Sequence, residues 1–269
     1  MQFSVNGKTV FAATGGKEFD PARPAMVFLH GAGMDHTVWV LLARWFAHRG
    51  FGVLAVDLPG HGRSQGEALT SIADMSDWTI ALLDNAGATA ATLVGHSMGS
   101  LIALKTAATH PDRVTALGLI GTAAAMPVSP DLLNAAKAND HAAIDMVDIW
   151  GHGYRASLGG SLNPGAWMLG GGMRLLEECP PGVLYADLAA CNDYRDGLAS
   201  AAKVTAPAVL VLGERDMMTP ARAGRDLAKA LPDATTVVLK GAGHMLMNER
   251  PDEVLAALRE LRSSQASAA

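Results

Sequence analysis

A serine with a glycine two positions away on each side is the residue of this chain best placed to act as a nucleophile. The segment reads Gly95-His96-Ser97-Met98-Gly99 and stands between an apolar, strand-like run at 91–94 and a helical pattern at 98–108. A serine at such a corner adopts a tight, strained turn, in which larger side chains at positions 95 and 99 would collide with neighbouring backbone. The turn lifts the hydroxyl clear of the sheet, and the N-terminus of the following helix points at the same place.

A serine hydroxyl becomes a good nucleophile only when a base removes its proton, and the usual base is an imidazole oriented by a carboxylate. The sequence supplies both groups after later strands. An apolar run at 207–212 ends shortly before Asp216, and another at 235–239 ends shortly before His244. Because active groups gather at the carboxyl edge of a parallel sheet, we expect Asp216 and His244 to meet Ser97 there.

Other polar residues compete for these roles. Glu214 follows the same strand as Asp216, and we expect it to point away as a surface or supporting group. His96 stands beside the serine and is interpreted as a packed structural histidine, as are His30 and His61, which lie in turns. Asp57 ends a strand and is expected to fix the glycine-rich loop that follows it.

The elements that must position these residues follow an alternating pattern. Segments 2–5 and 8–13 flank Asn6-Gly7, a dipeptide favoured in tight hairpin turns. Buried-type apolar runs then alternate with helical periodicity. The runs cover 25–29, 52–56, 91–94, 116–120, 207–212 and 235–239. This alternation predicts an α/β fold with a mostly parallel sheet and helices on both faces.

Residues 123–202 break the alternation. Helical patches there cover about 131–150, 164–178 and 183–192, and glycine clusters stand at 159–160 and 170–172. We expect a core formed by residues 1–122 and 203–269, with 123–202 as a helical cap, or lid, over the carboxyl edge of the sheet. The glycine clusters fit either hinges or tight loops, and periodicity does not distinguish the two.

Composition limits the partners. The chain has 269 residues, 49% of them apolar and 17% charged, so a sizeable buried core is available. A net charge of −5 without a basic cluster argues against nucleic acid. No apolar run approaches the roughly 20 residues of a membrane span, and no signal peptide is recognisable, so we expect no membrane association and a cytoplasmic location.

Metal and disulfide chemistry are not predicted either. No acid or other ligand stands at metal-ligand spacing from five histidines, so no metal site is expected at His36, His48, His110, His141 or His152. Cys179 and Cys191 are expected to be free thiols.

Five motifs in order resemble those of the α/β-hydrolase family in its capped form. They are His30-Gly31-Ala32-Gly33, the segment 58–64, the serine turn at 95–99, the segment 213–216 and Gly243-His244. The resemblance is strong over 25–122 and 203–262. Between these ranges the chain shares only the general helical nature of the family's inserted segment. The resemblance implies an eight-stranded, mostly parallel sheet with an N-terminal antiparallel hairpin and a helical cap inserted after the sixth strand.

The resemblance also implies the catalytic roles. Ser97 would attack an acyl carbon, His244 would take its proton, and Asp216 would orient the imidazole. The backbone N–H groups of Ala32 and Met98 would form the oxyanion hole, and no cofactor would be needed. Charge grows on that oxygen only in the transition state, so losing one such donor typically costs about 3–4 kcal/mol.

The substrate is less closely defined. Most Met and Trp residues of the cap are expected in its core, and a minority in an apolar pocket. The pocket candidates are Met34, Trp39, Met126, Met146, Trp150, Trp167, Met168 and Met245. The family resemblance implies a serine hydrolase acting on a small to medium, largely apolar carboxylic ester, thioester or lactone through an acyl-enzyme. A C–C bond hydrolase on the same triad and a slow-turnover ligand sensor or regulatory partner remain as alternatives. The partner would be a small-molecule substrate, and the chain would be a monomer or homodimer.

Overall fold

The described residues build one twisted sheet. The computed structural model describes residues 1–161 and 167–266, with side chains as far as residue 261. These residues form an eight-stranded sheet in the order β1-β2-β4-β3-β5-β6-β7-β8. The strands are β1 (Gln2–Val5), β2 (Lys8–Ala13), β3 (Ala25–Leu29), β4 (Gly52–Val56), β5 (Ala91–His96), β6 (Val114–Ile120), β7 (Ala208–Gly213) and β8 (Ala234–Leu239).

The strand directions confirm the predicted sheet. β1 pairs antiparallel with β2, and β2 antiparallel with β4, whereas all the pairings from β4 to β8 are parallel. The β1–β2 hairpin turns at Asn6 and Gly7, with φ values of 49° and 73°. A two-residue hairpin loop of this kind needs positive φ at both central positions, which Asn-Gly supplies at low cost.

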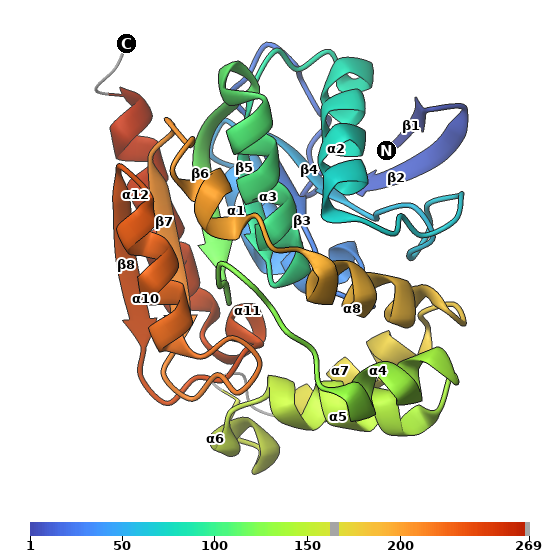
Figure 1. The fold of residues 1–269 in the computed structure, drawn as a ribbon. Helices are drawn as coiled ribbons and strands as arrows, with labels where there is room; N and C mark the ends of the chain where they lie inside the picture. The colour runs from blue at the N-terminus through green and yellow to red at the C-terminus, as the bar shows by residue number, and fades with distance from the viewer. Residues whose placement is uncertain (162–166, 267–269) are drawn as a thin grey trace.

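Helices cover both faces of the sheet (Figure 1). α2 (Ile72–Ala86), α3 (Met98–Thr109) and α10 (Ala221–Ala230) pack on one face, and α1 (Val40–Ala47) and α12 (Pro251–Ala266) pack on the other. Strand β3 serves both cores, because successive side chains of a strand point to opposite faces. Val27 and Leu29 join the first core, whereas Met26 and Phe28 join the second.

The segment between β6 and β7 is helical. Its described elements are α4 (Pro130–Lys137), α5 (His141–Gly151), α6 (Tyr154–Ser157), α7 (Met168–Glu177), α8 (Val183–Asp193) and α9 (Gly197–Ala201). We call residues 123–202 the cap segment. Helices α4 to α7 gather at the end of the sheet toward which the arrows of β6 and β8 point (Figure 1). Leu132, Val147 and Leu176 belong to a separate apolar cluster in this segment.

Details of the cap segment differ from the sequence prediction. The predicted helical stretch 131–150 is divided, because Asn139 adopts a φ of 53° and Asp140 caps the N-terminus of α5. Gly170, Gly171 and Gly172 lie inside α7 and form neither a hinge nor a loop. The Gly159–Gly160 pair is a tight turn that ends α6, where the Gly160 N–H donates to the Arg155 carbonyl. Positions 164–166 of the predicted helix 164–178 lie outside the described residues.

Candidate active site

Ser97 occupies a strained backbone turn between β5 and α3. Its φ and ψ are 51° and −118°, a region that non-glycine residues rarely adopt. A Cβ at Gly95 would collide with the Gly99 carbonyl, and a Cβ at Gly99 would collide with the Leu29 carbonyl, so both positions require glycine. The Ser97 N–H donates to the Ile120 carbonyl at 2.9 Å, which fixes the turn against β6. The predicted serine turn thus forms as its flanking glycines demand.

Asp216 and His244 form a buried pair after β7 and β8. His244 Nδ1 lies 2.8 Å from Asp216 Oδ2. Asp216 Oδ1 accepts hydrogen bonds from the N–H groups of Met218 and Thr219 at 2.8 and 2.7 Å. Burial alone would raise the pKa of Asp216, but the His244 imidazole and the hydrogen bonds from His244 and Thr219 outweigh it and lower the pKa below its ordinary value. The residue is therefore an ionised carboxylate.

The end of β6 brings the imidazole and the serine to the same edge of the sheet. Ser97 is bonded to Ile120, and the next residue, Gly121, lies against the His244 ring. A Cβ at Gly121 would stand 3.0 Å from two atoms of that ring. A carboxylate only accepts hydrogen bonds, so His244 Nδ1 carries the proton that Asp216 accepts. In this tautomer of a neutral imidazole, Nε2 is the ring nitrogen that can accept a proton.

The competing polar residues near this pair take supporting positions, as the sequence predicts. His96 Nε2 donates to the His244 carbonyl at 3.0 Å, and the two rings lie 4.7 Å apart. Burial lowers the pKa of His96 to about 3, so this ring is neutral. Glu214 accepts from the Gly241 N–H at 3.0 Å and is exposed, whereas His244 is buried.

The two predicted oxyanion donors lie on segments that border the serine. A Cβ at Gly31 would stand 3.3 Å from Ser97 Cβ, so the loop of residues 30–33 lies against Ser97. Ala32 follows in that loop. Met98 is the first residue of α3, and the N–H groups of a first helical turn have no partner within the helix.

A largely apolar cavity of about 190 Å³ opens on Ser97. Its lining includes Thr219 from the core and Met126, Trp150 and Leu188 from the cap segment. None of the described lining residues carries a charged side chain. Burial raises the pKa of the Cys191 thiol in this lining, so that group is also neutral. The cavity suits an uncharged group.

Met126 and Trp150 are the two predicted pocket residues that line this cavity; the other six lie elsewhere. Met34, Trp39 and Met245 are buried in the core on the α1 and α12 face. Three belong to the cap segment: Met146, half-buried against its apolar cluster, Met168, which is buried, and Trp167, which is 71% exposed. Large apolar side chains serve mainly to fill cores, and their residue type alone does not distinguish the two uses.

Thr219 is a site residue that sequence reasoning missed. Its hydroxyl donates to Asp216 Oδ2 at 2.7 Å and lies 3.2 Å from His244 Nδ1. A signal was present in the sequence, because an aspartate followed by a turn commonly accepts from N–H groups two and three residues later. That spacing puts the side chain of residue 219 beside the carboxylate.

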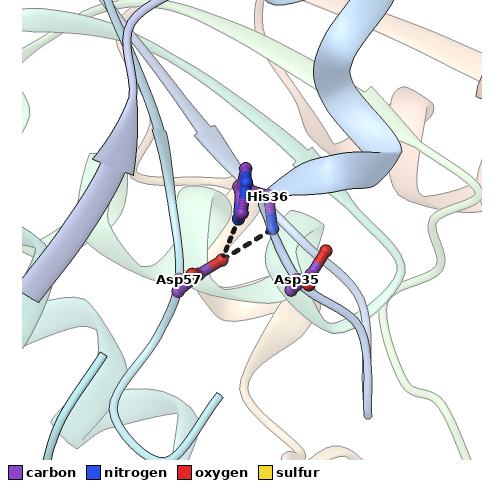
Figure 2. Close-up of side chains that lie close together, drawn as sticks. All are labelled: Asp35, His36 and Asp57. Carbon is purple, nitrogen blue, oxygen red and sulfur yellow. Dashed lines mark hydrogen bonds and ion pairs between the residues drawn. The ribbon is translucent and has the colours of Figure 1, made fainter. Parts of the chain in front are cut away.

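A second cluster of acid and imidazole groups lies outside the cavity. Figure 2 shows Asp35, His36 and Asp57, whose possible metal-ligating atoms lie within 4.8 Å of one another. Asp57 Oδ1 accepts from both His36 Nδ1 at 2.7 Å and the His36 N–H at 2.8 Å, and Asp57 Oδ2 accepts from the Arg63 N–H at 2.9 Å. His36 therefore does meet an acid, contrary to the sequence prediction. Hydrogen bonds account for the cluster, and they fix the loop after Asp57 as expected.

Comparison with known proteins agrees with this architecture. The model of the alpha/beta hydrolase fold family matches residues 24–251. Pimeloyl-[acyl-carrier protein] methyl ester esterases of Aromatoleum aromaticum and Chromobacterium violaceum are 30% and 32% identical to the chain over 255 residues. The matches cover 86% and 90% of this chain and 95% and 96% of those proteins.

The fold is also found among solved structures. The enol-lactonase of Burkholderia xenovorans superimposes with a TM-score of 0.87 at 22% identity, covering 98% of this chain and 100% of that one, a likeness of fold. No helix within 1–161 or 167–266 is long and apolar enough to cross a membrane.

Proposed function

The chain belongs to the alpha/beta hydrolase fold family and is a hydrolase, and from this premise we propose that it cleaves small to medium, uncharged carboxylic esters, thioesters or lactones through an acyl-enzyme on Ser97. The observation that carries the proposal is the buried Asp216–His244 pair at 2.8 Å, which faces the same sheet edge as a serine in a strained turn. An imidazole held by a buried carboxylate is the arrangement that removes the proton of a serine nucleophile in serine hydrolases.

The proposed steps assign one role to each of these groups. Ser97 Oγ attacks the acyl carbon and passes its proton to His244 Nε2, while Asp216 stabilises the imidazolium that forms. The N–H groups of Ala32 and Met98 receive the developing oxyanion. His244 then gives the proton to the leaving group. A water molecule, deprotonated by the same imidazole, attacks the acyl carbon, and His244 returns this proton to Ser97 Oγ as the acid leaves. Residues 123–202 act as a cap domain over the cavity.

The cavity supports the substrate class. A dry cavity of about 150 Å³ holds a benzene molecule, so a cavity of about 190 Å³ fits one ring or a short acyl chain. The relatives named above act on a methyl ester and an enol-lactone, and both substrates contain a carboxylic ester bond. A C–C bond hydrolase would need a further polar group for the enol, and Ser129 and Thr219 are the residues with hydroxyl groups in the described lining besides Ser97.

A series of p-nitrophenyl esters from acetyl to dodecanoyl tests the proposal. We expect steady turnover that is fastest for short acyl chains, and no turnover by Ser97→Ala. A fluorophosphonate probe should add one adduct to the wild-type chain, mapped to Ser97 by mass spectrometry. A folded wild-type protein that is neither labelled nor active would overturn the proposal. A single stoichiometric burst without turnover would favour the sensor alternative instead.

A further inference from the structure

A buried carboxylate of the cap segment reaches the loop that would hold the oxyanion. Asp187 lies in α8 and has no exposed surface. Its Oδ2 accepts hydrogen bonds from the Gly33 N–H and from His61 Nε2, each at 2.8 Å. These partners stand 154 and 126 residues away in the sequence. One oxygen of the cap segment therefore joins two loops of the core.

His61 faces hydrogen-bond acceptors on both sides. Its Nδ1 lies 3.0 Å from the Pro59 carbonyl oxygen, and its Nε2 faces the Asp187 carboxylate. A carbonyl and an ionised carboxylate only accept hydrogen bonds, so with Asp187 ionised both ring nitrogens carry protons and the ring is an imidazolium. Burial tends to lower the pKa of His61, but the Asp187 carboxylate outweighs burial and raises it. Asp187 and His61 thus form a buried ion pair whose charges cancel.

The same contact holds the loop by packing. Gly33 adopts a φ of +67°, and a Cβ there would meet Leu184 of α8 at 2.9 Å and Leu176 of α7 at 3.1 Å. The backbone of residue 33 is therefore enclosed by cap side chains, and its N–H points at Asp187. Gly33 directly follows Ala32 and shares a peptide plane with its carbonyl. The direction of the Ala32 N–H depends on how this loop is held.

We propose that Asp187 is a positioning residue for the oxyanion hole, holding the loop of residues 30–33 from the cap segment while His61 neutralises its charge. This inference rests on the proposed function. A lone carboxylate near a developing oxyanion would repel it, whereas the ion pair supplies the acceptor without net charge. The oxyanion donors are then complete only when α8 is docked on the core.

Substitution of Asp187 tests the inference. We expect Asp187→Ala to lower kcat for a p-nitrophenyl ester about 10- to 100-fold with little change in KM, because a small misplacement of catalytic groups can cost about 100-fold. Binding of an alkyl boronic acid, which forms a tetrahedral anionic adduct on serine, should weaken by a similar factor. Asp187→Asn retains an oxygen acceptor for Gly33 and should recover part of the loss.

A second pair of variants separates positioning from folding. His61→Gln should reduce kcat, and the double variant with Asp187→Asn should be no worse than the more impaired single variant, since the two residues act as a pair. Asp148→Asn is the matched control. Asp148 is also buried in the cap segment, 3.4 Å from His152, but its carboxylate bonds to neither catalytic loop in the described structure. This control should retain kcat and boronic acid affinity.

The outcomes distinguish this inference from the proposed function. A wild-type chain without turnover or fluorophosphonate labelling would remove the proposed function itself. An active wild type with a folded Asp187→Ala variant of unchanged kcat and boronic acid affinity would overturn the positioning role alone. If Asp187→Ala does not fold, the Asp187→Asn and His61→Gln variants carry the same comparison. Lower thermal stability with unaltered kinetics in those variants would also overturn it.

Discussion

At the scale of single residues, Thr219 links the proposed acid to the proposed base. Its hydroxyl donates to the Asp216 oxygen that His244 also contacts, and its backbone N–H donates to the other oxygen. The carboxylate is therefore held at both oxygens by one residue. This arrangement keeps Asp216 ionised and fixes the plane in which it meets the imidazole.

Replacing Thr219 with valine removes the hydroxyl while nearly preserving its shape. A hydrogen bond to a charged group contributes about 1.5–3 kcal/mol, so we expect kcat/KM to fall roughly 10- to 100-fold. The pKa of Asp216 should rise, because one donor that stabilises its charged form is lost. Thr219→Ser should recover most activity. A pH profile of kcat/KM measures both effects, and a valine variant with wild-type kinetics would contradict the role.

The choice between the two acids after β7 can be tested directly. Asp216→Asn should lower kcat by about four orders of magnitude, as the loss of an orienting aspartate does in serine hydrolases. Glu214→Gln should stay within about twofold of wild type, because Glu214 bonds the Gly241 N–H at the surface. Steady-state rates with a p-nitrophenyl ester decide the matter, and the reverse ranking would assign the acid to Glu214.

At the scale of elements, the cap segment is bonded to the histidine loop as well as to the loop of residues 30–33. The Gly151 carbonyl at the end of α5 accepts from the N–H groups of His244 and Met245, both at 2.9 Å. The buried Glu249 carboxylate of α11 (Leu246–Glu249) accepts from Gly243 and from Gly153. The cap segment therefore supports the loops on both sides of Ser97, and it does more than cover the cavity.

The glycines of α7 provide a matched test of how the cap segment packs. A Cβ at Gly172 would collide with the Asp148 carboxylate, so Gly172→Ala should destabilise the protein by about 1–3 kcal/mol. Gly171 faces open space, and Gly171→Ala should stabilise it by roughly 0.5–1 kcal/mol through better helix propensity. Urea unfolding followed by circular dichroism measures both. Equal effects of the two substitutions would contradict the packing described for α7.

The features that the sequence predicts correctly are those determined by residues close together in the chain. The hairpin at Asn6-Gly7 and the serine turn follow from local backbone demands, and the strands follow from apolar runs. Asp187 and His61 meet across 126 residues, and no spacing in the sequence encodes that pair. Trp39 and Met245 were predicted to line the pocket but lie in the core. Residue type does not separate the two places, because a large apolar side chain fits either. Helix α7 of the cap segment was harder to predict, because its glycines have low helix propensity. Gly172 is there because only a glycine leaves room for the Asp148 carboxylate, and this packing is not visible in the sequence.

At the scale of the whole molecule, some buried histidines have a lowered pKa and one has a raised pKa. Stability should therefore decrease both when the pH falls and when it rises. His30 Nδ1 donates to the Gly31 carbonyl, and its Nε2 accepts from the Leu58 N–H, so the ring is held neutral. Burial lowers the pKa of both His30 and His96 to about 3. His61 is the opposite case, because Asp187 raises its pKa despite burial. The neighbouring His61 also lowers the pKa of His30, and Asp57 and His36 act on it more weakly. His244 and Asp216 act on His96.

The sign of each contribution follows from linkage. Below the unfolded pKa of about 6.5, the unfolded chain gains protons at residues 30 and 96 that the folded chain refuses until about pH 3. Stability should therefore fall by up to about 1.4 kcal/mol per pH unit for each of these two histidines as pH drops below 6.5. The stabilisation from protonated His61 is complete below 6.5 and is lost as pH rises through its raised folded pKa. The free energy of unfolding should thus reach its maximum near neutral pH.

Two substitutions test which histidine causes the loss of stability at acid pH (the acid limb) and which causes the loss at alkaline pH. His96→Gln retains a donor for the His244 carbonyl and removes one titrating ring, so the acid limb should become about half as steep. His61→Gln should flatten the part of the alkaline decline that arises from the ion pair with Asp187. Urea unfolding at pH values from 4.5 to about 9 measures both slopes. An acid limb of unchanged slope in His96→Gln would mean that this histidine is protonated in the folded state, and the neutral ring assigned to it behind His244 would then be wrong.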